Sequence, residues 1–518
     1  MAKQLMSSSI SAPAFYGLNT QESGVTLQEG FALQADNCVI DKYGRLGSRK
    51  GWQTLSTKKD GSTNGNNGVN LTGVSNFKDV VGADTLLSFS VNKFYKGLTN
   101  LVTLTPSTGD TIAAGNWQTA TLNNHHYFFQ RGYLPLVYTN DGGADTFQSI
   151  VAHSGRAGTP PSAHTVLAAY GRLWAADTAT NKNTVSFTDV LDGTAWSGGT
   201  SGNINISSVL TQGMDEIVAL GAHNGFLVIF CKNNIIIYGD GNNFQAGMTT
   251  ASLTLVEVIE GVGCIARDSV QNTGEDILFL SNTGIRSLSR TIQEKSQPMR
   301  DISKNVRDDV IQAINSENIN LIKSTYSPTN AFYLITFPTS QQTFVFDTRT
   351  PLEDGSFRAT IWPSVSPKGF LSIDSTLYFA EANGIAEYKG YQDNGAKYEM
   401  AYYSRFFDLG MANVSKIVKK LSATTVGATG QTFALKIGYD YSPVYFSYTF
   451  TLDTGTVFEY GITEYGIGKY SGSVLIDEQK ASTQGAGDII QIGFTTDISG
   501  APMSLQKISL YAKQGKVL

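Results

Sequence analysis

The feature that most constrains the fold is a unit of two short apolar segments joined by a polar turn. In one copy, the run FLVIF at residues 226–230 precedes a turn and then the run IIIY at residues 235–238. Short apolar runs bounded by turn residues are typical of buried β-strands. Copies occupy residues 86–95, 126–138, 171–187, 226–238, 277–288, 331–347 and 376–388.

The copies recur at spacings of roughly 40–55 residues, which is the period of a β-propeller blade. A four-stranded blade leaves its faces uncovered until neighbouring blades stack on it, so a series of blades closes into a ring. We therefore predict an all-β protein with a propeller of six or seven blades over residues 71–397. An irregular pair of β-sandwiches is the alternative that this pattern leaves open.

The composition favours the same fold class. The chain has 24 Tyr, 27 Phe and 53 Gly, a mixture that suits strands separated by many turns. Charged residues make up 16 % of the chain, against about 25 % in a typical soluble domain. So few charges also suggest a surface that sister subunits cover.

The two ends of the chain differ from the middle. Residues 1–70 are expected to form an N-terminal arm and hairpin that docks as part of a platform, with a turn-rich linker at residues 57–70. From about residue 398, apolar side chains alternate with polar ones, which predicts an antiparallel β-sandwich over residues 398–518. The clearest alternating positions are Phe433, Leu435, Ile437 and Tyr439, followed by Val444, Phe446, Tyr448, Phe450 and Leu452.

One segment has a helical rather than a β pattern. Apolar residues stand at positions 302, 306, 310 and 314, which share one face of an α-helix. We expect a helical insertion near residues 301–316 that packs on the rim of the propeller.

Catalytic signatures are scarce. The sequence contains no His-x-x-x-His, Cys-x-x-Cys or Gly-x-Ser-x-Gly motif, and the adjacent His125 and His126 would point to opposite faces of a strand. Residues 186–196 loosely match an Asp-box hairpin, and residues 239–243 a calcium loop that lacks its bidentate Glu. Packed hairpins and turns explain both, so we expect no enzymatic activity, no metal and no cofactor.

Charge and targeting patterns limit the partners. The net charge is −5 and the pI about 5.6, so a global basic balance for nucleic-acid binding is absent. The three cysteines, Cys38, Cys231 and Cys264, are odd in number and far apart, which favours a reducing compartment. Neither a signal-peptide pattern nor a run of 18 apolar residues occurs, so we expect no membrane insertion.

Two N-terminal motifs resemble a known family. The first is a Pro-x-Phe-x-Gly element, and the second an Asn followed by Gly-x-Leu-x-x-Arg-x-Gly ahead of the propeller. This opening resembles that of the tail nozzle (tail tubular) proteins of short-tailed bacteriophages, the podoviruses. The matching residues are Pro13, Phe15, Gly17, Asn37, Gly44, Leu46, Arg49 and Gly51.

The resemblance implies a virion structural protein, assembled in the host cytoplasm. Six copies would form a ring below the adaptor ring, contact tail fibres or spikes, and build the distal channel that retains the genome and opens for ejection. Double-stranded DNA would pass without sequence-specific binding, and a mildly acidic chain suits such passage. Two alternatives remain open: a tail protein whose propeller binds a receptor or binds or cleaves carbohydrate, and a cytoplasmic interaction propeller.

Two sets of residues are candidates for these roles. The segment NCVIDKYGRLGSRKGW at residues 37–52 places three cations within six residues, which suits either a phosphate site or a solvated hairpin. The acidic total favours the hairpin, and we expect Arg49 and Trp52 to anchor it against the body of the protein. We also predict subunit or adaptor contacts there through Arg45, Arg49, Lys50 and Trp52. Acidic residues expected to line the channel are Asp215, Glu216, Asp308 and Asp309.

Overall fold

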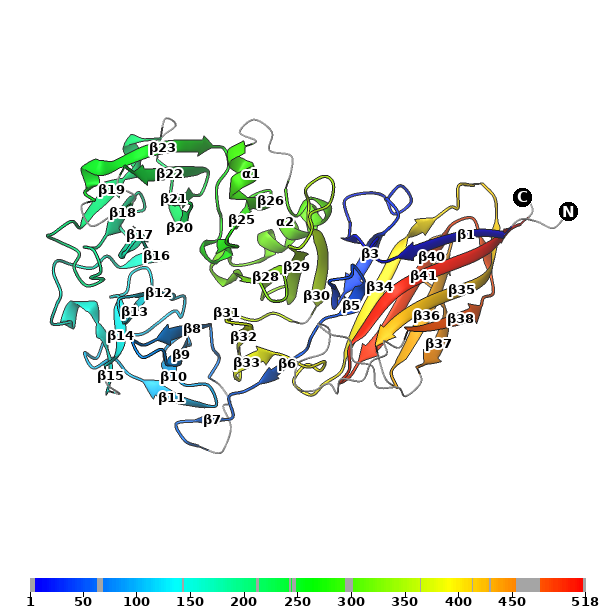
Figure 1. Cartoon of the computed structure of the whole chain (residues 1–518), viewed down its shortest axis with the longest axis horizontal. Coiled ribbons are helices and arrows are strands. Elements are labelled where there is room, and N and C mark those ends of the chain that lie inside the picture. Colours follow the sequence, from blue (N-terminus) through cyan, green and yellow to red (C-terminus); the bar gives the residue numbers. More distant parts are fainter. Residues whose placement is uncertain are drawn as a thin grey trace.

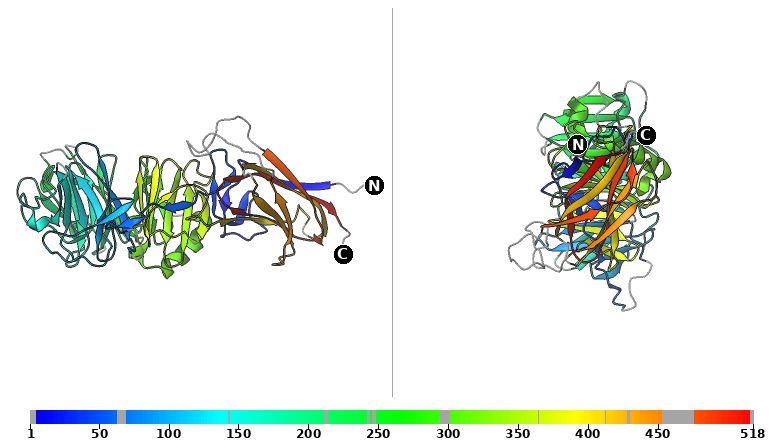
Figure 2. Two further views of the ribbon diagram at one scale, coloured as in Figure 1. Left: turned by 90° about the horizontal axis from the view of Figure 1, so that it is seen from below. Right: turned by 90° about the vertical axis from the view of Figure 1, so that its right-hand side faces the viewer.

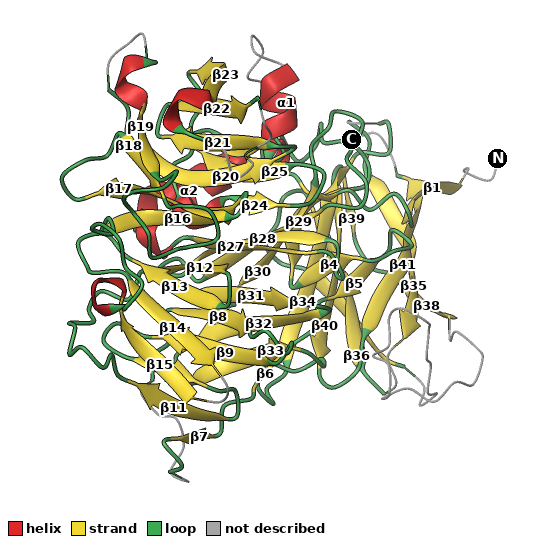
Figure 3. Cartoon of the chain, turned by 60° about the vertical axis from the view of Figure 1, so that its left-hand side comes forward, coloured by secondary structure: helices red, strands yellow, loops and turns green. Residues whose placement is uncertain are grey.

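The molecule consists of a ring of β-sheets and a β-sandwich, which lie next to each other along its long axis (Figures 1 and 2). The computed structural model describes residues 5–62, 69–141, 144–210, 214–241, 244, 248–293, 301–363, 365–411, 413–427, 430–452 and 476–515. Strands dominate these residues, and the helices are short (Figure 3). The predicted all-β class is confirmed.

Six blades of a β-propeller, each built on four antiparallel strands, lie in the described part of the chain, and a three-stranded sheet completes the ring. The first blade contains β8 (Gly73–Lys78), β9 (Asp84–Phe89), β10 (Phe94–Lys96) and β11 (Asn100–Leu104), extended by β7 (Lys58–Lys59). The second contains β12 (Gln118–Leu122), β13 (His125–Phe129), β14 (Leu136–Asp141) and β15 (Ala144–Ser149). The third contains β16 (Ala163–Ala169), β17 (Arg172–Thr178), β18 (Thr184–Phe187) and β19 (Gly202–Asn205).

The rest of the ring follows in chain order. The fourth blade contains β20 (Ile217–His223), β21 (Phe226–Cys231), β22 (Asn234–Asp240) and β23 (Leu253–Glu260). The three-stranded sheet contains β24 (Gln271–Asn272), β25 (Ile277–Ser281) and β26 (Gly284–Ser287). The fifth blade contains β27 (Lys323–Ser327), β28 (Phe332–Phe337), β29 (Gln342–Asp347) and β30 (Arg358–Pro363). The sixth contains β31 (Gly369–Ile373), β32 (Thr376–Glu381), β33 (Gly384–Tyr388) and β6 (Trp52–Thr54).

Each of the seven predicted segment pairs forms two neighbouring antiparallel strands. Their side chains are buried because sheets pack on both faces of a blade; all six residues of β28 are buried, for example. The propeller prediction is therefore confirmed, and the ring is made of these repeating hairpins.

The N-terminal segment closes the ring. Strand β6 comes from before the first blade and pairs with β33 in the last, with Trp52 opposite Tyr388. Behind this closure, an apolar cluster that includes Leu71, Tyr95 and Ile385 joins residues of the first and last blades. Strand pairing and apolar contacts between segments far apart in the sequence therefore hold the ring closed.

The sandwich combines the C-terminal strands with N-terminal ones, and the predicted sandwich is confirmed. One sheet contains β38 (Ile476–Ser482), β39 (Ala486–Gly487), β35 (Lys416–Gly427), β41 (Met503–Gln514), β1 (Leu5–Ser11), β5 (Leu46–Ser48) and β4 (Cys38–Ile40). The other contains β2 (Gly17–Leu18), β3 (Phe31–Asp36), β34 (Tyr398–Phe407), β40 (Ile490–Ile498), β36 (Thr432–Tyr439) and β37 (Phe446–Thr451). The predicted alternating segments pair as β36 and β37, with Leu435 opposite Tyr448.

The two bodies share one continuous sheet. Strand β3 runs parallel to β30 of the fifth blade, where Asp36 lies opposite Ile361. The N-terminal segment, expected as an arm and hairpin, thus supplies β1 and β3–β5 to the sandwich and β6 to the propeller. Because backbone hydrogen bonds join the bodies, they form one unit rather than two loosely linked domains.

Two α-helices of the described residues pack beside the ring: α1 (Leu288–Gln293) and α2 (Arg307–Ser316). The predicted helical insertion is confirmed as α2, which a 3-10 turn at Lys304–Val306 precedes. The expected face is the buried one, since Ile302, Val306 and Val310 join the main core. Further 3-10 turns occupy Ile150–Ala152, Ile206–Ser208, Thr250–Ser252, Arg267–Ser269 and Ile319–Leu321.

The ring closure yields a prediction at Gly51. A Cβ atom there would lie 2.0 Å from the backbone oxygen of Gln392, so Gly51→Ala must displace the chain that follows the last blade. We expect a loss of roughly 2 kcal/mol or more in unfolding free energy. Urea unfolding followed by tryptophan fluorescence measures it. In the control Gly241→Ala, no atom lies within 4 Å of the added Cβ, and an equal loss there would contradict this account.

Candidate functional site

Charged side chains meet at the centre of the propeller. Arg267 donates hydrogen bonds to the backbone oxygen of His164 at 2.6 Å and to Asn116 Oδ1 at 2.9 Å. Lys323 Nζ lies 2.9 Å from Asn116 Oδ1 and 2.5 Å from Asp268 Oδ2. Arg267 also pairs with Asp268 at 2.8 Å. We call these five residues the axial network.

The axial network joins sheets that are not neighbours in the ring. Asn116 precedes β12 and His164 lies in β16, whereas Arg267 and Asp268 precede β24 and Lys323 begins β27. A bond between the start of β12 and the start of β27 must cross the middle of the ring. The chain's own side chains therefore bridge the propeller centre at this level.

The electrostatics of the axial network favour one charge state. Burial tends to raise the pKa of Asp268, but Arg267 and Lys323 outweigh it and hold that pKa below its usual value. Burial, together with the positive charge of Arg267, lowers the pKa of His164, so its imidazole is neutral at pH 7. Two cations and one carboxylate thus share hydrogen bonds, with Arg267 buried and Asp268 and Lys323 half-buried, an arrangement typical of a structural bridge.

A second buried cluster joins the propeller to the sandwich, around Arg49. Its guanidinium makes two parallel bonds to Asp393, at 2.7 and 2.6 Å, and a third to Asn37 Oδ1 at 2.8 Å. The cation also lies 3.9 Å from the centre of the Tyr398 ring, whose hydroxyl donates to the Arg49 backbone oxygen. Three segments meet here: the N-terminal hairpin, the chain after the last blade, and β34. We call this cluster the Arg49 joint.

The structure corrects the prediction for Arg49 and Arg45. Their side chains were expected at a subunit or adaptor surface, but the two residues are 1 % and 4 % exposed. Arg45 pairs with Asp41 at 2.7 Å inside the hairpin. Both cations are therefore used within the chain, and neither is available for direct contact with a partner.

The other two predicted contact residues, Lys50 and Trp52, are both half-buried. Lys50 is half-buried, and its backbone N–H donates to the Tyr388 hydroxyl at 3.0 Å. Trp52 is half-buried in the closing strand β6 and packs against the core between the last two blades. Their predicted partner contacts stay predictions.

The acidic residues that were expected to line the channel lie in two separate regions of the fold. Asp215 is 5 % exposed and accepts hydrogen bonds from the backbone and side chain of Asn233, so the structure corrects its predicted lumen exposure. Glu216, just before the fourth blade, forms an ion pair at 2.9 Å with Lys182 in the β17–β18 turn of the third blade, and both side chains are exposed. The structure does not bring these two together with the pair Asp308 and Asp309.

Asp308 and Asp309 lie in the first turn of α2, where carboxylates stabilise a helix N-terminus. Asp309 accepts a hydrogen bond from Thr20 at 2.5 Å, which ties the helix to the N-terminal segment. Their predicted lumen role stays a prediction.

The remaining motifs have structural partners. In the Asp-box-like hairpin, Asp192 accepts from the backbone N–H of Thr194 at 2.8 Å, and Trp196 packs against Phe129. The calcium-loop-like segment at residues 239–243 lies partly outside the described residues, and within them Asp240 accepts from the Phe244 N–H at 2.9 Å. Across the described ranges, no group of three or more His, Cys, Asp or Glu side chains is placed to hold a metal ion.

Two further expectations concern the cysteines and membrane insertion. Burial raises the pKa of the Cys231 and Cys264 thiols, and all three cysteines are buried and free of disulfides. None of the described helices is both long and apolar enough to cross a bilayer.

Sequence reasoning missed the axial network and the partners of Arg49, although it predicted that Arg49 and Trp52 anchor the hairpin against the rest of the chain. The only local signal was a pair of opposite charges, Arg267 and Asp268, directly after an apolar run. Neither the spacing of Asn116 and Lys323 nor that of Arg49 and Asp393 follows a motif, because these partners meet only when the ring closes.

Comparisons with known proteins give weak matches. No family model and no curated protein matches this chain. Among solved structures, the computationally designed Ika8 protein has a TM-score of 0.36 at 10 % identity, covering 65 % of this chain and 99 % of its own. BamB from Moraxella catarrhalis has a TM-score of 0.36 at 10 % identity, covering 74 % and 97 %.

A third structure, PorZ of the type-IX secretion system of Porphyromonas gingivalis, has a TM-score of 0.34 at 12 % identity. The match covers 64 % of this chain and 37 % of PorZ. None of these three is described as a phage tail nozzle, and similarities at this level carry no functional argument.

The Arg49 joint yields a prediction for stability. Arg49→Ala leaves the Asp393 carboxylate and Asn37 without their buried partner, and breaking such a pair costs about 3 kcal/mol. We expect the urea midpoint to fall accordingly. Arg156→Ala, which removes an exposed arginine, serves as the control. A midpoint that Arg49→Ala leaves unchanged would contradict the structural role of the joint.

The axial network yields a pH-dependent prediction. Because the folded-state pKa of Asp268 lies below its unfolded value, its contribution is complete above the unfolded pKa of 3.8. That contribution is lost as pH falls through the folded-state pKa. Asp268→Asn should lower the unfolding free energy by roughly 3 kcal/mol at pH 7, and the gap to wild type should narrow below about pH 4.

Chemical unfolding of both proteins from pH 7 to pH 2.5 measures this difference in unfolding free energy. Because the other carboxylates titrate in both proteins, their effect cancels in the difference. Glu353→Gln, at an exposed carboxylate, is the control. A gap that stays constant over the whole range would show that the charge of Asp268 is not what stabilises the network.

Proposed function

We propose that this chain is the subunit of a tail nozzle of a short-tailed bacteriophage, a virion structural protein without enzymatic activity. Six copies form a ring below the tail adaptor, contact the fibres or spikes, and surround the distal DNA channel. The ring retains the packaged genome and opens for ejection, and assembly takes place in the host cytoplasm.

The main support for this proposal is the position of the residues that match the motifs of the tail nozzle family. Asn37, Arg49 and Gly51 all belong to the contact between propeller and sandwich, where Asn37 adopts a φ of 54° and accepts the Arg49 Nε–H. Leu46 is fully buried in the sandwich sheet. The resemblance is therefore to residues that hold the two bodies together, which supports a shared architecture.

The residues of the Pro-x-Phe-x-Gly motif also lie in close contacts within the fold. Gly17 has a φ of 82°, and a Cβ there would lie 2.5 Å from the backbone oxygen of Ala359 in the fifth blade. Gly44 has a φ of 72°, and its Cβ would lie 2.6 Å from Pro13 Cβ. Pro13, Gly17 and Gly44 thus occupy tight contacts, and Phe15 is buried against Tyr402.

The axial network supports a channel that lies outside the propeller of each subunit. Since Arg267, Asp268 and Lys323 bridge the ring centre, a duplex would not pass through the propeller of one subunit. The channel would instead lie on the symmetry axis, between copies. The net charge of −5 suits this role, because phosphates do not adhere to a chain of like charge.

The oligomeric state tests this proposal. Mass photometry and negative-stain images of the purified protein, alone and with the adaptor ring, should show six-fold rings with an axial hole. The expected mass of the ring is six times the 55.8 kDa of one chain. A monomer in both samples that hydrolyses a polysaccharide would contradict the proposal and favour a glycan-cleaving tail propeller.

A further inference from the structure

The axial network places an amine, a primary amide and a carboxylate against one another. Lys323 Nζ lies 2.9 Å from Asn116 Oδ1 and 2.5 Å from Asp268 Oδ2. Arg267 donates to the same Asn116 oxygen at 2.9 Å. The bridging role of the network uses only the charges of these groups. Their chemical types allow a further step, because an amine can attack a polarised amide carbon.

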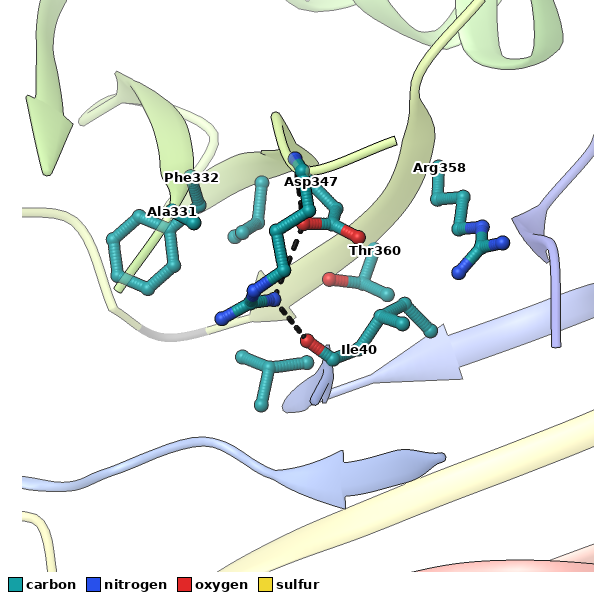
Figure 4. A pocket seen from close by; sticks show the side chains of 9 residues that line it. Ile40, Ala331, Phe332, Asp347, Arg358 and Thr360 are labelled. Carbon is teal, nitrogen blue, oxygen red and sulfur yellow. Dashed lines mark hydrogen bonds and ion pairs between the residues drawn. The ribbon is translucent and has the colours of Figure 1, made fainter. Parts of the chain in front are cut away.

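Another contact between distant segments shows the contrast. Arg349 pairs with Asp347 at 3.2 Å and donates to the Ile40 backbone oxygen at 2.7 Å, as the dashed lines in Figure 4 show. A guanidinium stays protonated in proteins and is not a nucleophile, so this contact remains a hydrogen bond. The axial network instead contains an amine, which becomes a nucleophile once it loses a proton.

The amine of Lys323 lies close to the carbon that it would attack. Because a C=O bond is about 1.2 Å long, Nζ is at most about 4.1 Å from Asn116 Cγ. The reacting atoms of a productive contact are about 3–3.5 Å apart, so the amine needs to move by about 1 Å at most.

The neighbours of this pair supply proton transfer and charge stabilisation. Asp268 accepts a hydrogen bond from Lys323 and is placed to take its proton. Burial lowers the pKa of Lys323 despite the opposing charge of Asp268, which makes the neutral amine more accessible than at a surface. Arg267 donates to Asn116 Oδ1, where negative charge develops when the amine adds to Cγ.

The network also carries one positive charge in excess. The cations Arg267 and Lys323 share the carboxylate of Asp268, and Arg267 is buried. An excess charge in such a site lacks a compensating partner. Converting the Lys323 ammonium into an amide leaves Arg267 and Asp268 as a balanced pair, which favours the reaction.

We propose that Lys323 and Asn116 form an intramolecular isopeptide bond across the centre of the propeller. The amine of Lys323 attacks Cγ of Asn116, a bond forms between Nζ and Cγ, and the bond between Cγ and Nδ2 breaks. Two protons move from Nζ through Asp268 to the departing nitrogen, which leaves as ammonium. The inference goes beyond the nozzle proposal and holds whether or not the chain forms rings.

A second amine–amide pair serves as an internal control. Lys368 Nζ lies 2.6 Å from Asn70 Oδ1, and Asn70 is exposed. Within the described residues, neither an ion pair to a carboxylate nor a hydrogen bond from a guanidinium accompanies this pair. We expect it to stay unlinked, because proximity alone supplies neither the proton transfer nor the polarised carbonyl.

Intact-mass spectrometry of the full-length protein, freshly purified and after incubation, tests the proposal. The expected mass is that of the sequence less one ammonia. After tryptic digestion, tandem spectra should show a branched pair of peptides joined through Asn116 and Lys323. The peptides that contain Asn70 and Lys368 should be found unlinked.

Three variants assign the roles. Lys323→Arg removes the amine but keeps the cation, and Asn116→Ala removes the amide, so each should show the full mass of its own sequence. Asp268→Ala should slow bond formation about a hundredfold or more, because it removes the proton carrier. The control Lys368→Arg should keep the loss of one ammonia.

Two results would overturn the proposal. An intact mass equal to that of the sequence, both fresh and after incubation, would show that the network stays non-covalent. A loss of ammonia that persists in Lys323→Arg would come from another residue, such as a succinimide at Asn224, which precedes Gly225. Ring formation is measured separately, so failure here is distinct from failure of the nozzle proposal.

Discussion

The buried pair of Arg49 and Asp393 is the interaction on which the arrangement of the two bodies depends. A guanidinium at 1 % exposure is costly unless each donor has an acceptor, and here a carboxylate, Asn37 and a backbone oxygen supply them. These acceptors come from the N-terminal hairpin and from the chain after the last blade. The charge therefore fixes where the hairpin, the propeller and the sandwich meet.

The axial network applies the same constraint inside the ring. Two cations and a carboxylate hold non-neighbouring sheets together, so the propeller is a solid support whose own axis is bridged. A subunit of this kind offers its outer surface, and not its own axis, to other molecules. This is why we propose a DNA channel between copies.

The elements that local patterns encode could be predicted from the sequence. Each pair of apolar runs became a hairpin, and positions 302, 306 and 310 became a buried helical face, because burial acts on neighbouring residues. The three residues of β6 show no such pattern, and the sequence predicted that Arg49 anchors the hairpin without indicating its partner. Its partner Asp393 is 344 residues away, so only the closed ring reveals the pair.

The central claim is that six copies surround the channel of a short tail. A cryo-electron density map of the parent particle tests it most directly. The account predicts six copies of this propeller and sandwich around the tail axis, distal to the adaptor, with DNA density between copies. Density for the chain only on side fibres, or outside the particle, would contradict it.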